Sequence, residues 1–544
     1  MEKKVPSDID NKMLVATWRL AFWGLLLVVL LTMIVRYGLI SVPLERDEGE
    51  YAYGGQLILQ GLLPYKLIYN MKLPGIYAAY AGLMTIFGQT HMGIHLGLMF
   101  INAATIIFVF LLARQLYDSI AGLVSAAVFA TMSLMPSVQG IFANAEHFVI
   151  LFSIAGLWVL VKATDEERIW LIFVSGLLLG CGFLMKQHGA VYILFGGLYI
   201  LIHQIRIRPV SGRQLVFKAG WFALGALIPY GLTCLVFVFN GIFDKFWFWT
   251  YQYAKAYTAL APLNVGIRLF KARTFDIIYS APLLWLLVLI GVPALWLDKQ
   301  ARRRIIFVGL FSFFSFMAIC PGFYFRPHYY ILLLPAAALL AGISIGAMNN
   351  RLLTFRPLIF KYGISLLLAC ICVLASIYAH RHFLFEMTPF QLSRAVYGLN
   401  PFPESLEVAQ FIRANTEEND RISVLGSEPQ IYFYAGRRSA SGYVYMYAMM
   451  ENHDYALEMQ KEMIQDIENA QPKFIVFVNV ATSWLKDQDS HTFLIDWIQR
   501  YQARHYRLAG LVTIDQKVTR YHWYQNVTWP PESPRWIAVL QRRT

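Results

Sequence analysis

Charged residues are scarce in this chain of 544 residues. Asp, Glu, Lys and Arg make up 15% of the sequence and hydrophobic residues 58%, whereas a soluble globular chain carries about 25% charged residues. The composition therefore excludes an ordinary soluble protein. Only five cysteines are present, and all lie in or beside apolar runs without the context of a metal site. We interpret them as packing residues.

A nucleic-acid-binding surface is also missing, although the net charge is +13. No soluble segment carries a basic stripe with interleaved aromatic residues, which nucleic-acid binding would need. The basic residues lie mostly in short loops between apolar runs. They indicate membrane topology and contact with anionic lipids rather than nucleic acid.

What the sequence does have is a series of long apolar runs, of the length that crosses a hydrocarbon core of about 30 Å. The first run, 17–40, lacks a small-residue cleavage site, so we interpret it as a retained helix rather than a signal peptide. A shorter apolar piece, 75–87, predicts an interfacial or re-entrant helix. The pattern predicts a polytopic α-helical membrane protein with about 11 transmembrane helices plus interfacial helices. The predicted spans are 17–40, 94–113, 119–138, 147–162, 169–185, 189–204, 217–239, 277–297, 304–320, 329–349 and 362–380.

Lys and Arg are denser in alternate loops, beginning with the N-terminal segment. This asymmetry predicts a cytoplasmic N-terminus, and an odd number of spans then places the C-terminus outside. From about residue 381 charges become frequent and the apolar runs stop. We predict a transmembrane domain over 1–380, with outer loops at 41–75, 139–147, 240–276 and 321–328, and a small extracytoplasmic α/β domain over 381–544. Its predicted strands are 421–425, 473–478, 506–512 and 536–540, with helices near 404–415, 452–468 and 491–503.

Polar side chains gather on the predicted outer side of the membrane. Polar groups at or within spans are functional candidates by default, because they face a cavity or one another. The alternatives are an ordinary solvated loop charge and an interfacial helix cap. The candidates are Asp47, Glu48, Lys72, Glu146, Lys186, His188, Arg326 and His328.

These residues sit in recognisable motifs. The first outer loop starts RDEGEYAYGG at Arg46, continues with GLLPY and ends with KLPG at Gly75. In order, the chain then has FG at 87–88, NAE at 144–146, KQ at 186–187 and RPHYY at 326–330, followed by Pro335. Over residues 15–350 this pattern resembles the dolichyl-phosphate-mannose–protein mannosyltransferases and the bacterial aminoarabinose–lipid A transferases. Both belong to the GT-C class of membrane glycosyltransferases.

The resemblance implies an inverting glycosyltransferase, a hexosyl- or pentosyltransferase. It would move a single sugar from a polyprenyl-phosphate donor to an acceptor hydroxyl on a lipid, glycan or protein, on the extracytoplasmic side. Asp47 matches the catalytic acid of the family and would act as the general base that takes the hydroxyl proton. Glu48 would orient the acceptor or the base. Glu146 matches an acid of the second outer loop that is usually Asp in the lipid A branch, which leaves its role open.

The leaving lipid phosphate gains charge in the transition state, so cations should surround it. Lys72 matches the phosphate-contacting lysine of the family, although Leu73-Pro74 replaces the two prolines of many relatives. Arg326 would bind phosphate oxygens in a bidentate manner. The remaining candidates for substrate binding are Tyr51, Lys186, His188 and His328.

No cofactor is required for this chemistry. A divalent metal could bind, but the sequence has no spaced ligand motif. We expect a bacterial inner membrane location. The alternative function is a transporter or flippase of lipid-linked sugars, which should show paired inverted halves that we do not find.

Overall fold

The computed structural model of the protein describes residues 8–206, 211–351, 358–516, 518–524, 527, 529–531 and 533–543. The chain divides into two compact units, each assembled from three stretches of sequence. The first unit comprises Met1–Leu39, Leu96–Val236 and Ala261–Glu386. The second comprises Ile40–His95, Phe237–Leu260 and Met387–Thr544.

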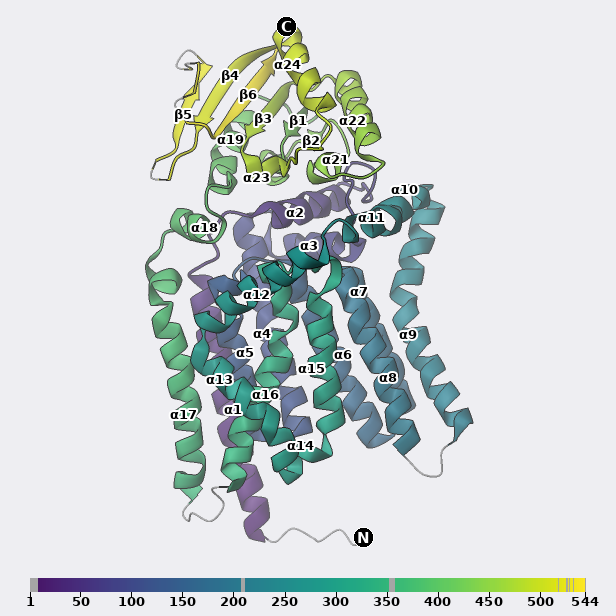
Figure 1. The fold of residues 1–544 in the computed structure, drawn as a ribbon, viewed down its shortest axis with the longest axis vertical. Helices are drawn as coiled ribbons and strands as arrows, with labels where there is room; N and C mark the ends of the chain where they lie inside the picture. The colour runs from purple at the N-terminus through teal and green to yellow at the C-terminus, as the bar shows by residue number, and fades with distance from the viewer. Residues whose placement is uncertain are drawn as a thin grey trace. The chain divides into compact units, whose positions relative to one another are not determined.

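The first unit is built from apolar helices that run side by side (Figure 1). Its long helices form because lipid leaves no other partner for backbone N–H and C=O groups than the helix itself. They are α1 (Asp8–Tyr37), α4 (His91–Leu116), α5 (Ser119–Met132), α6 (Ala145–Glu166), α7 (Ile169–Met185), α8 (Ala190–Arg206), α9 (Gly212–Phe239), α12 (Leu263–Ser280), α13 (Pro282–Leu297), α15 (Ile305–Ile319), α16 (Leu334–Arg351) and α17 (Leu358–Ala379). Short turns connect them: η1 (Pro136–Val138), η2 (Gln187–Gly189), α14 (Lys299–Arg303), η4 (Pro321–Phe323), η5 (Pro327–Leu332) and η7 (His382–Glu386).

Among the described residues, six helices are long and apolar enough to cross a membrane. A seventh span arises if α12 and α13 count as one, although they bend by 105° where Ala281 precedes Pro282. Four further apolar helices have 10–17 residues. The prediction of a mostly helical, polytopic membrane protein is confirmed, and the count of about 11 spans stays a prediction.

Small residues set the closest helix crossings in the first unit. A Cβ added to Gly176 or Gly180 of α7 would collide with backbone carbonyls of α9, and one added to Gly342 of α16 would collide with α5. Such positions let helix backbones approach, which is how helices associate in lipid without a hydrophobic driving force between them.

The stretch 240–276, predicted as an outer loop, is largely helical. It contains α10 (Phe243–Trp247), the π-helical turn η3 (Phe248–Tyr253), α11 (Ala254–Thr258) and most of α12. Four charged residues interrupt α12 (Arg268, Lys271, Arg273 and Asp276), so no long apolar run marks it in the sequence.

The second unit joins two short helices, α2 (Arg46–Leu59) and α3 (Pro74–Phe87), to the C-terminal segment, residues 389–543. Its six strands form one sheet in the order β2-β1-β3-β6-β4-β5 (Figure 1). The strands are β1 (Arg421–Leu425), β2 (Arg438–Ser439), β3 (Phe474–Asn479), β4 (Tyr506–Thr513), β5 (Arg520–Trp523) and β6 (Trp536–Arg542). The helices are α18 (Pro389–Tyr397), α19 (Phe402–Ala414), α20 (Gln430–Ala435), α21 (Tyr447–Met450), α22 (Ala456–Ala470), α23 (Ala481–Trp484) and α24 (Phe493–His505).

The strand pairs from β2 through β1 to β3, on one side of the sheet, run parallel, and the pairs from β3 through β6 and β4 to β5 run antiparallel. The four strands predicted from short β-like runs correspond to β1, β3, β4 and β6, to within two residues at each end. The short edge strands β2 and β5 carry too few residues to give a pattern of their own.

Helix α2 packs directly on the C-terminal segment. A Cβ on Gly49 would lie 2.6 Å from both the backbone nitrogen and the Cβ of Gln430, the first residue of α20. One turn later the ring of Tyr53 stacks on Tyr432, with centroids 5.2 Å apart. The Tyr53 hydroxyl accepts a hydrogen bond from the backbone N–H of Ser439 at 2.7 Å. Helix α20 and strand β2 therefore support α2 at Gly49 and Tyr53.

Candidate functional site

Asp47 lies in the first turn of α2. Glu45 caps the helix: its side chain accepts from the N–H of Glu48, while the Glu48 carboxylate accepts from the N–H of Glu45, both at 3.0 Å. This reciprocal pair satisfies two backbone donors that a helix start leaves without partners. Carboxylates in a first turn are also stabilised by the helix dipole. The local sequence thus fixes where the Asp47 side chain leaves the helix.

The Asp47 carboxylate meets the predicted phosphate-binding lysine. The ammonium of Lys72 lies 3.2 Å from Asp47 Oδ2 and also 3.2 Å from the hydroxyl oxygen of Tyr51. The Asp47 and Lys72 side chains are 14% and 13% exposed, so the pair is shielded but still open to solvent. On the other carboxylate oxygen, Tyr445 donates a hydrogen bond to Oδ1 at 2.9 Å. An acid, a cation and two phenols therefore converge, and we call this group the Asp47 cluster.

A buried acid, Glu50, organises the loop that carries Lys72. Its carboxyl oxygens accept from Asn70 Nδ2 at 2.9 Å and from the Tyr77 hydroxyl at 2.5 Å. The Tyr65 hydroxyl donates to the backbone carbonyl of Lys72 at 2.6 Å. Burial raises the pKa of Glu50 to about 8, in spite of the nearby Lys72 ammonium. Burial therefore favours the neutral form of Glu50.

Glu48, the other acid of the predicted pair, points elsewhere. Its Oε1 lies 2.8 Å from Nε2 of His95, and the other ring nitrogen of His95 lies 3.0 Å from the carbonyl of Ile40. The Glu48 side chain is fully buried. Consecutive helix residues are about 100° apart around the axis, so neighbouring acids face different surroundings. The predicted orienting role of Glu48 stays a prediction.

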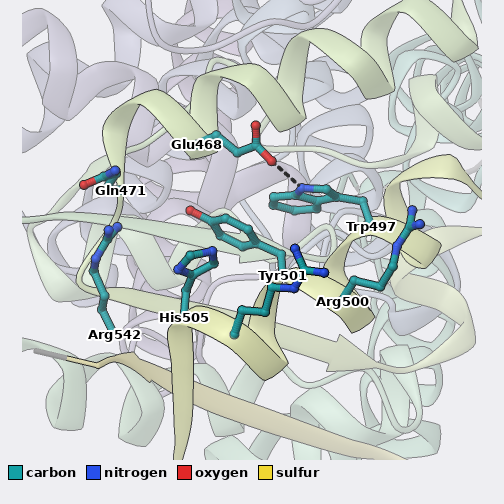
Figure 2. Close-up of a pocket in the computed structure, with 8 residues that line it drawn as sticks. Glu468, Gln471, Trp497, Arg500, Tyr501, His505 and Arg542 are labelled. Atoms are coloured by element: carbon teal, nitrogen blue, oxygen red, sulfur yellow. Dashed lines mark hydrogen bonds between the residues drawn. The ribbon is translucent and has the colours of Figure 1, made fainter.

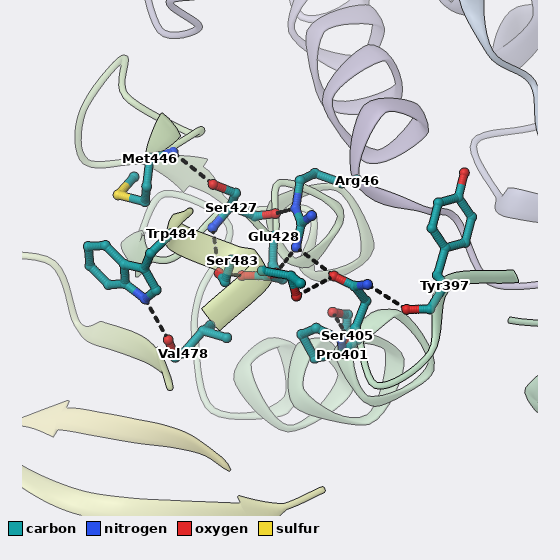
Figure 3. Close-up of polar contacts among 12 residues, drawn as sticks. Arg46, Tyr397, Pro401, Ser405, Ser427, Glu428, Met446, Val478, Ser483 and Trp484 are labelled. Atoms are coloured by element: carbon teal, nitrogen blue, oxygen red, sulfur yellow. Dashed lines mark hydrogen bonds and ion pairs between the residues drawn. The ribbon is translucent and has the colours of Figure 1, made fainter. Parts of the chain in front are cut away.

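Arg46, which precedes Asp47, is anchored in the C-terminal segment (Figure 3). Its Nε donates to the carbonyl of Ser427 at 2.5 Å, and its guanidinium forms an ion pair with Glu428 at 2.9 Å. Further hydrogen bonds go to Tyr447 at 2.7 Å and Asn400 at 3.1 Å. Glu428 is fully buried and also accepts from the hydroxyl of Ser483.

Glu146, in the first unit, forms a second polar cluster at the start of α6. Lys186 lies 2.5 Å from Glu146 Oε1 and His328 lies 4.0 Å from the same oxygen. The Glu146 and Lys186 side chains are 1% and 9% exposed. Glu146 Oε2 has no hydrogen-bond partner within the part of the chain that the structure describes. This Glu146 cluster brings together three residues that lie up to 182 positions apart in the sequence.

The other predicted residues of this unit lie around Tyr329. The Lys186 ammonium lies 4.3 Å from the centre of the Tyr329 ring, and the ring of His188 packs on the same tyrosine with centroids 4.7 Å apart. His188 Nδ1 is 2.8 Å from the carbonyl of Ala318. Arg326 precedes the turn η5 and its guanidinium lies 5.6 Å from the centre of the Tyr324 ring.

The structure therefore brings Asp47, Lys72 and Tyr51 together in one unit, and Glu146, Lys186 and His328 together in the other. Sequence reasoning missed Tyr445 and Glu50. The acidic spacing within RDEGE could have pointed to Glu50, but no local signal marks Tyr445. Within the described residues, no group of three or more His, Cys, Asp or Glu side chains is arranged to hold a metal ion. Metal dependence stays a prediction.

A pocket of about 410 Å³ opens in the C-terminal segment between α22, α24 and β6 (Figure 2). The Trp497 indole donates to Glu468 at 2.7 Å and its ring stacks on Tyr501, with centroids 4.6 Å apart. Basic residues complete the lining: Arg500, Arg504, His505 and Arg542. The pocket shares no residue with either cluster, and we assign it no step in the chemistry.

Comparisons with known proteins agree with the motifs. Residues 72–238 match the family model for dolichyl-phosphate-mannose-protein mannosyltransferase. This range starts at Lys72, so Asp47 lies outside it. A comparison with curated protein sequences finds no match.

Solved structures share the fold over nearly the whole chain. ArnT from Cupriavidus metallidurans in the apo state is 15% identical, with a TM-score of 0.59, over 95% of this chain and 97% of that chain. The same protein bound to undecaprenyl phosphate gives a TM-score of 0.56 at the same identity and coverage. The oligosaccharyltransferase AglB from Archaeoglobus fulgidus, in complex with an inhibitory peptide and a dolichol-phosphate, is 11% identical, with a TM-score of 0.53, over 96% of this chain and 76% of that chain. The resemblance seen in the motifs is confirmed, and this integral membrane protein has the GT-C glycosyltransferase fold.

Proposed function

We propose that this protein is an inverting glycosyltransferase. It moves a single sugar from a polyprenyl-phosphate donor to an acceptor hydroxyl on the extracytoplasmic side of the membrane. The observation that carries the proposal is the partly open ion pair between Asp47 and Lys72, 3.2 Å apart at the start of α2. The pair supplies the two groups that the reaction needs, a proton acceptor and a cation for the leaving phosphate.

Asp47 acts as the general base. An alcohol is a poor nucleophile until a carboxylate accepts its proton during attack. The acceptor oxygen forms a bond to the anomeric carbon as the bond from that carbon to the phosphate oxygen breaks. The hydroxyl proton goes to Asp47, and the bonding electrons leave with the lipid phosphate. Attack opposite the leaving group inverts the anomeric configuration.

Lys72 stabilises the charge that develops on the phosphate. Its ammonium lies 3.2 Å from both Asp47 Oδ2 and the Tyr51 hydroxyl oxygen, and we propose that it also binds a phosphate oxygen of the donor. Arg326 stays a proposed phosphate ligand, because a guanidinium suits bidentate binding. Lys186 and His328 stay proposed substrate-binding residues, and Lys186 is paired with Glu146 at 2.5 Å.

The partners of this reaction are a lipid-linked sugar, an acceptor lipid, glycan or protein, and membrane lipids. We propose the bacterial inner membrane as the location, with a cytoplasmic N-terminus and the C-terminal segment outside as a small α/β domain. A transporter of lipid-linked sugars is the alternative. It would move its cargo across the bilayer without forming a new glycosidic bond.

The test uses the purified full-length protein in liposomes with a panel of radiolabelled polyprenyl-phosphate sugars and lipid or glycan acceptors from cell membranes. Asp47→Asn should lower kcat by about 10²- to 10⁴-fold, the range of general-base catalysis, and still bind polyprenyl phosphate. The exposed acid Asp244, changed to Asn, is the matched control and should keep wild-type transfer. Equal transfer by wild type and Asp47→Asn would overturn the proposal, as would cargo movement with no glycosylated product.

A further inference from the structure

Two segments far apart in the sequence hold the carboxylate of Asp47. Lys72 lies on one oxygen and Tyr445 donates to the other, at 2.9 Å. Tyr445 is 398 positions from Asp47, in the connection between β2 and α21 of the C-terminal segment. Its ring packs edge-on against Tyr447, with centroids 4.8 Å apart. The C-terminal segment therefore reaches the reacting group itself.

A single residue, Ser427, sets the register of this contact (Figure 3). Its backbone carbonyl accepts from Arg46 Nε at 2.5 Å, and its hydroxyl accepts from the N–H of Met446 at 2.9 Å. Arg46 precedes Asp47 in the chain and Met446 follows Tyr445. Ser427 therefore binds the chain neighbour of each residue in the contact, Arg46 beside Asp47 and Met446 beside Tyr445.

We propose that Tyr445 is a positioning residue, which holds Asp47 Oδ1 so that Oδ2, the oxygen beside Lys72, faces the acceptor hydroxyl. The C-terminal segment is then a working part of the active site rather than a cap. This inference rests on the proposed function of Asp47 as the general base.

The phenol is suited to this task. A hydrogen bond from a neutral donor stabilises the ionised carboxylate, which is the form that can accept a proton. Burial, together with the adjacent Asp47 carboxylate, raises the pKa of Tyr445 well above its usual value, so the phenol stays a donor. The other titratable groups that act on this site are Glu45, Arg46, Glu50, Tyr51, Lys72, Tyr77, Tyr80 and Tyr447. All of them remain in the variants below.

The experiment measures kcat, the donor KM and the pH profile of sugar transfer for Tyr445→Phe in the full-length protein. The ring packing is kept and one hydrogen bond is lost. We expect kcat to fall about 10- to 100-fold with less than a threefold change in donor KM, because the phosphate contacts are unchanged. The acidic limb of the kcat profile should move to higher pH by about one unit, the order of one hydrogen bond to a charged group.

Tyr443→Phe is the matched control. This buried phenol, two residues away, donates at 2.6 Å to Glu462 rather than to Asp47. Its variant should keep the wild-type pH profile and rate. A merely structural role for this stretch would make the two variants behave alike.

Two results overturn the inference. One is an unchanged rate and profile in Tyr445→Phe, and the other is an equal shift in Tyr443→Phe. If Tyr445→Phe folds poorly, a fluorinated tyrosine at position 445 replaces it in the test, because it has the same shape and is a stronger hydrogen-bond donor. This residue should move the acidic limb of the kcat profile to lower pH, and an unmoved acidic limb also overturns the inference. If wild type transfers no sugar and Asp47→Asn makes no difference, the proposed function fails. If Asp47→Asn is inactive and Tyr445→Phe transfers sugar at the wild-type rate, only the proposed role of Tyr445 is refuted and the proposed function stands.

Discussion

Substitutions in the buried ion pair of Glu146 and Lys186 test how paired buried charges affect the stability of the first unit. The charged atoms are 2.5 Å apart, with side chains 1% and 9% exposed. At an effective dielectric constant of about 20, this separation corresponds to an attraction of about 7 kcal/mol. The cost of taking both charges out of water offsets much of it. Removing one partner leaves an uncompensated buried charge, which destabilises proteins by about 3–5 kcal/mol.

We therefore expect Glu146→Gln and Lys186→Met each to lower the free energy of unfolding by about 3–5 kcal/mol. The double variant leaves no charge behind and should return to within about 1 kcal/mol of wild type. Unfolding of the purified full-length protein in detergent, followed by tryptophan fluorescence, measures all four corners of the cycle. The exposed pair Lys461 and Glu458, 3.1 Å apart, is the control and should couple by less than about 1 kcal/mol.

A double variant as unstable as either single one would refute this reasoning, because it would show that the charges themselves are not the cause. Sugar transfer by the same proteins separates structure from chemistry. Recovered stability without recovered transfer assigns Glu146 a part in the reaction. Recovery of both assigns it a supporting role.

Three further predictions concern α2. The pKa of Glu50 is raised from 4.5 to about 8, so the folded state favours its neutral form. The contribution of Glu50 to the free energy of unfolding is therefore lost as the pH rises from about 4.5 through about 8. The variant Glu50→Gln should keep activity at pH 7, and its stability, measured by thermal unfolding, should change less with pH over that range. Gly49→Ala should destabilise the protein by about 1–3 kcal/mol in denaturant unfolding, because its Cβ would meet α20, whereas Gly82→Ala, with nothing within 4 Å, should be neutral or slightly stabilising. Arg46→Met should lower the free energy of unfolding by about 3–5 kcal/mol, because Glu428 is left buried without its cation. The double variant with Glu428→Gln should recover most of this loss in the same denaturant measurement.

Membrane class could be predicted, and candidate site residues could be selected, because both signals are local. Apolar runs mark the spans, and charges within or beside such runs are rare enough to stand out. This reasoning selected Asp47 and Lys72, which the structure pairs at 3.2 Å, and likewise Glu146 and Lys186. Short β-like runs in the C-terminal segment predicted the longer strands for the same reason.

The rest depended on contacts between distant residues. Nothing near Tyr445 in the sequence indicates that its phenol reaches Asp47, because strand order and connection lengths decide that contact. Glu48 looked equivalent to Asp47 from adjacency alone, but the helical turn directs it into the buried contact with His95. Helix α12 escaped detection because four charged residues interrupt its apolar run, and only Gly266 and Ile277 of the helix are buried.

The arrangement of α2 shows what the C-terminal segment contributes to the second unit. Helix α2 has 14 residues, three of them glycines, and carries Arg46, Asp47, Glu48 and Glu50. Neither helix propensity nor lipid can hold such a short polar helix in place, because isolated helices of this length are marginal. Its position must come from packing, and the structure supplies this through α3 on one side and through α20 and the Ser427–Glu428 anchor on the other. The proposed role of Asp47 as general base requires such packing, because a general base must be held within a fraction of an ångström of its proton donor.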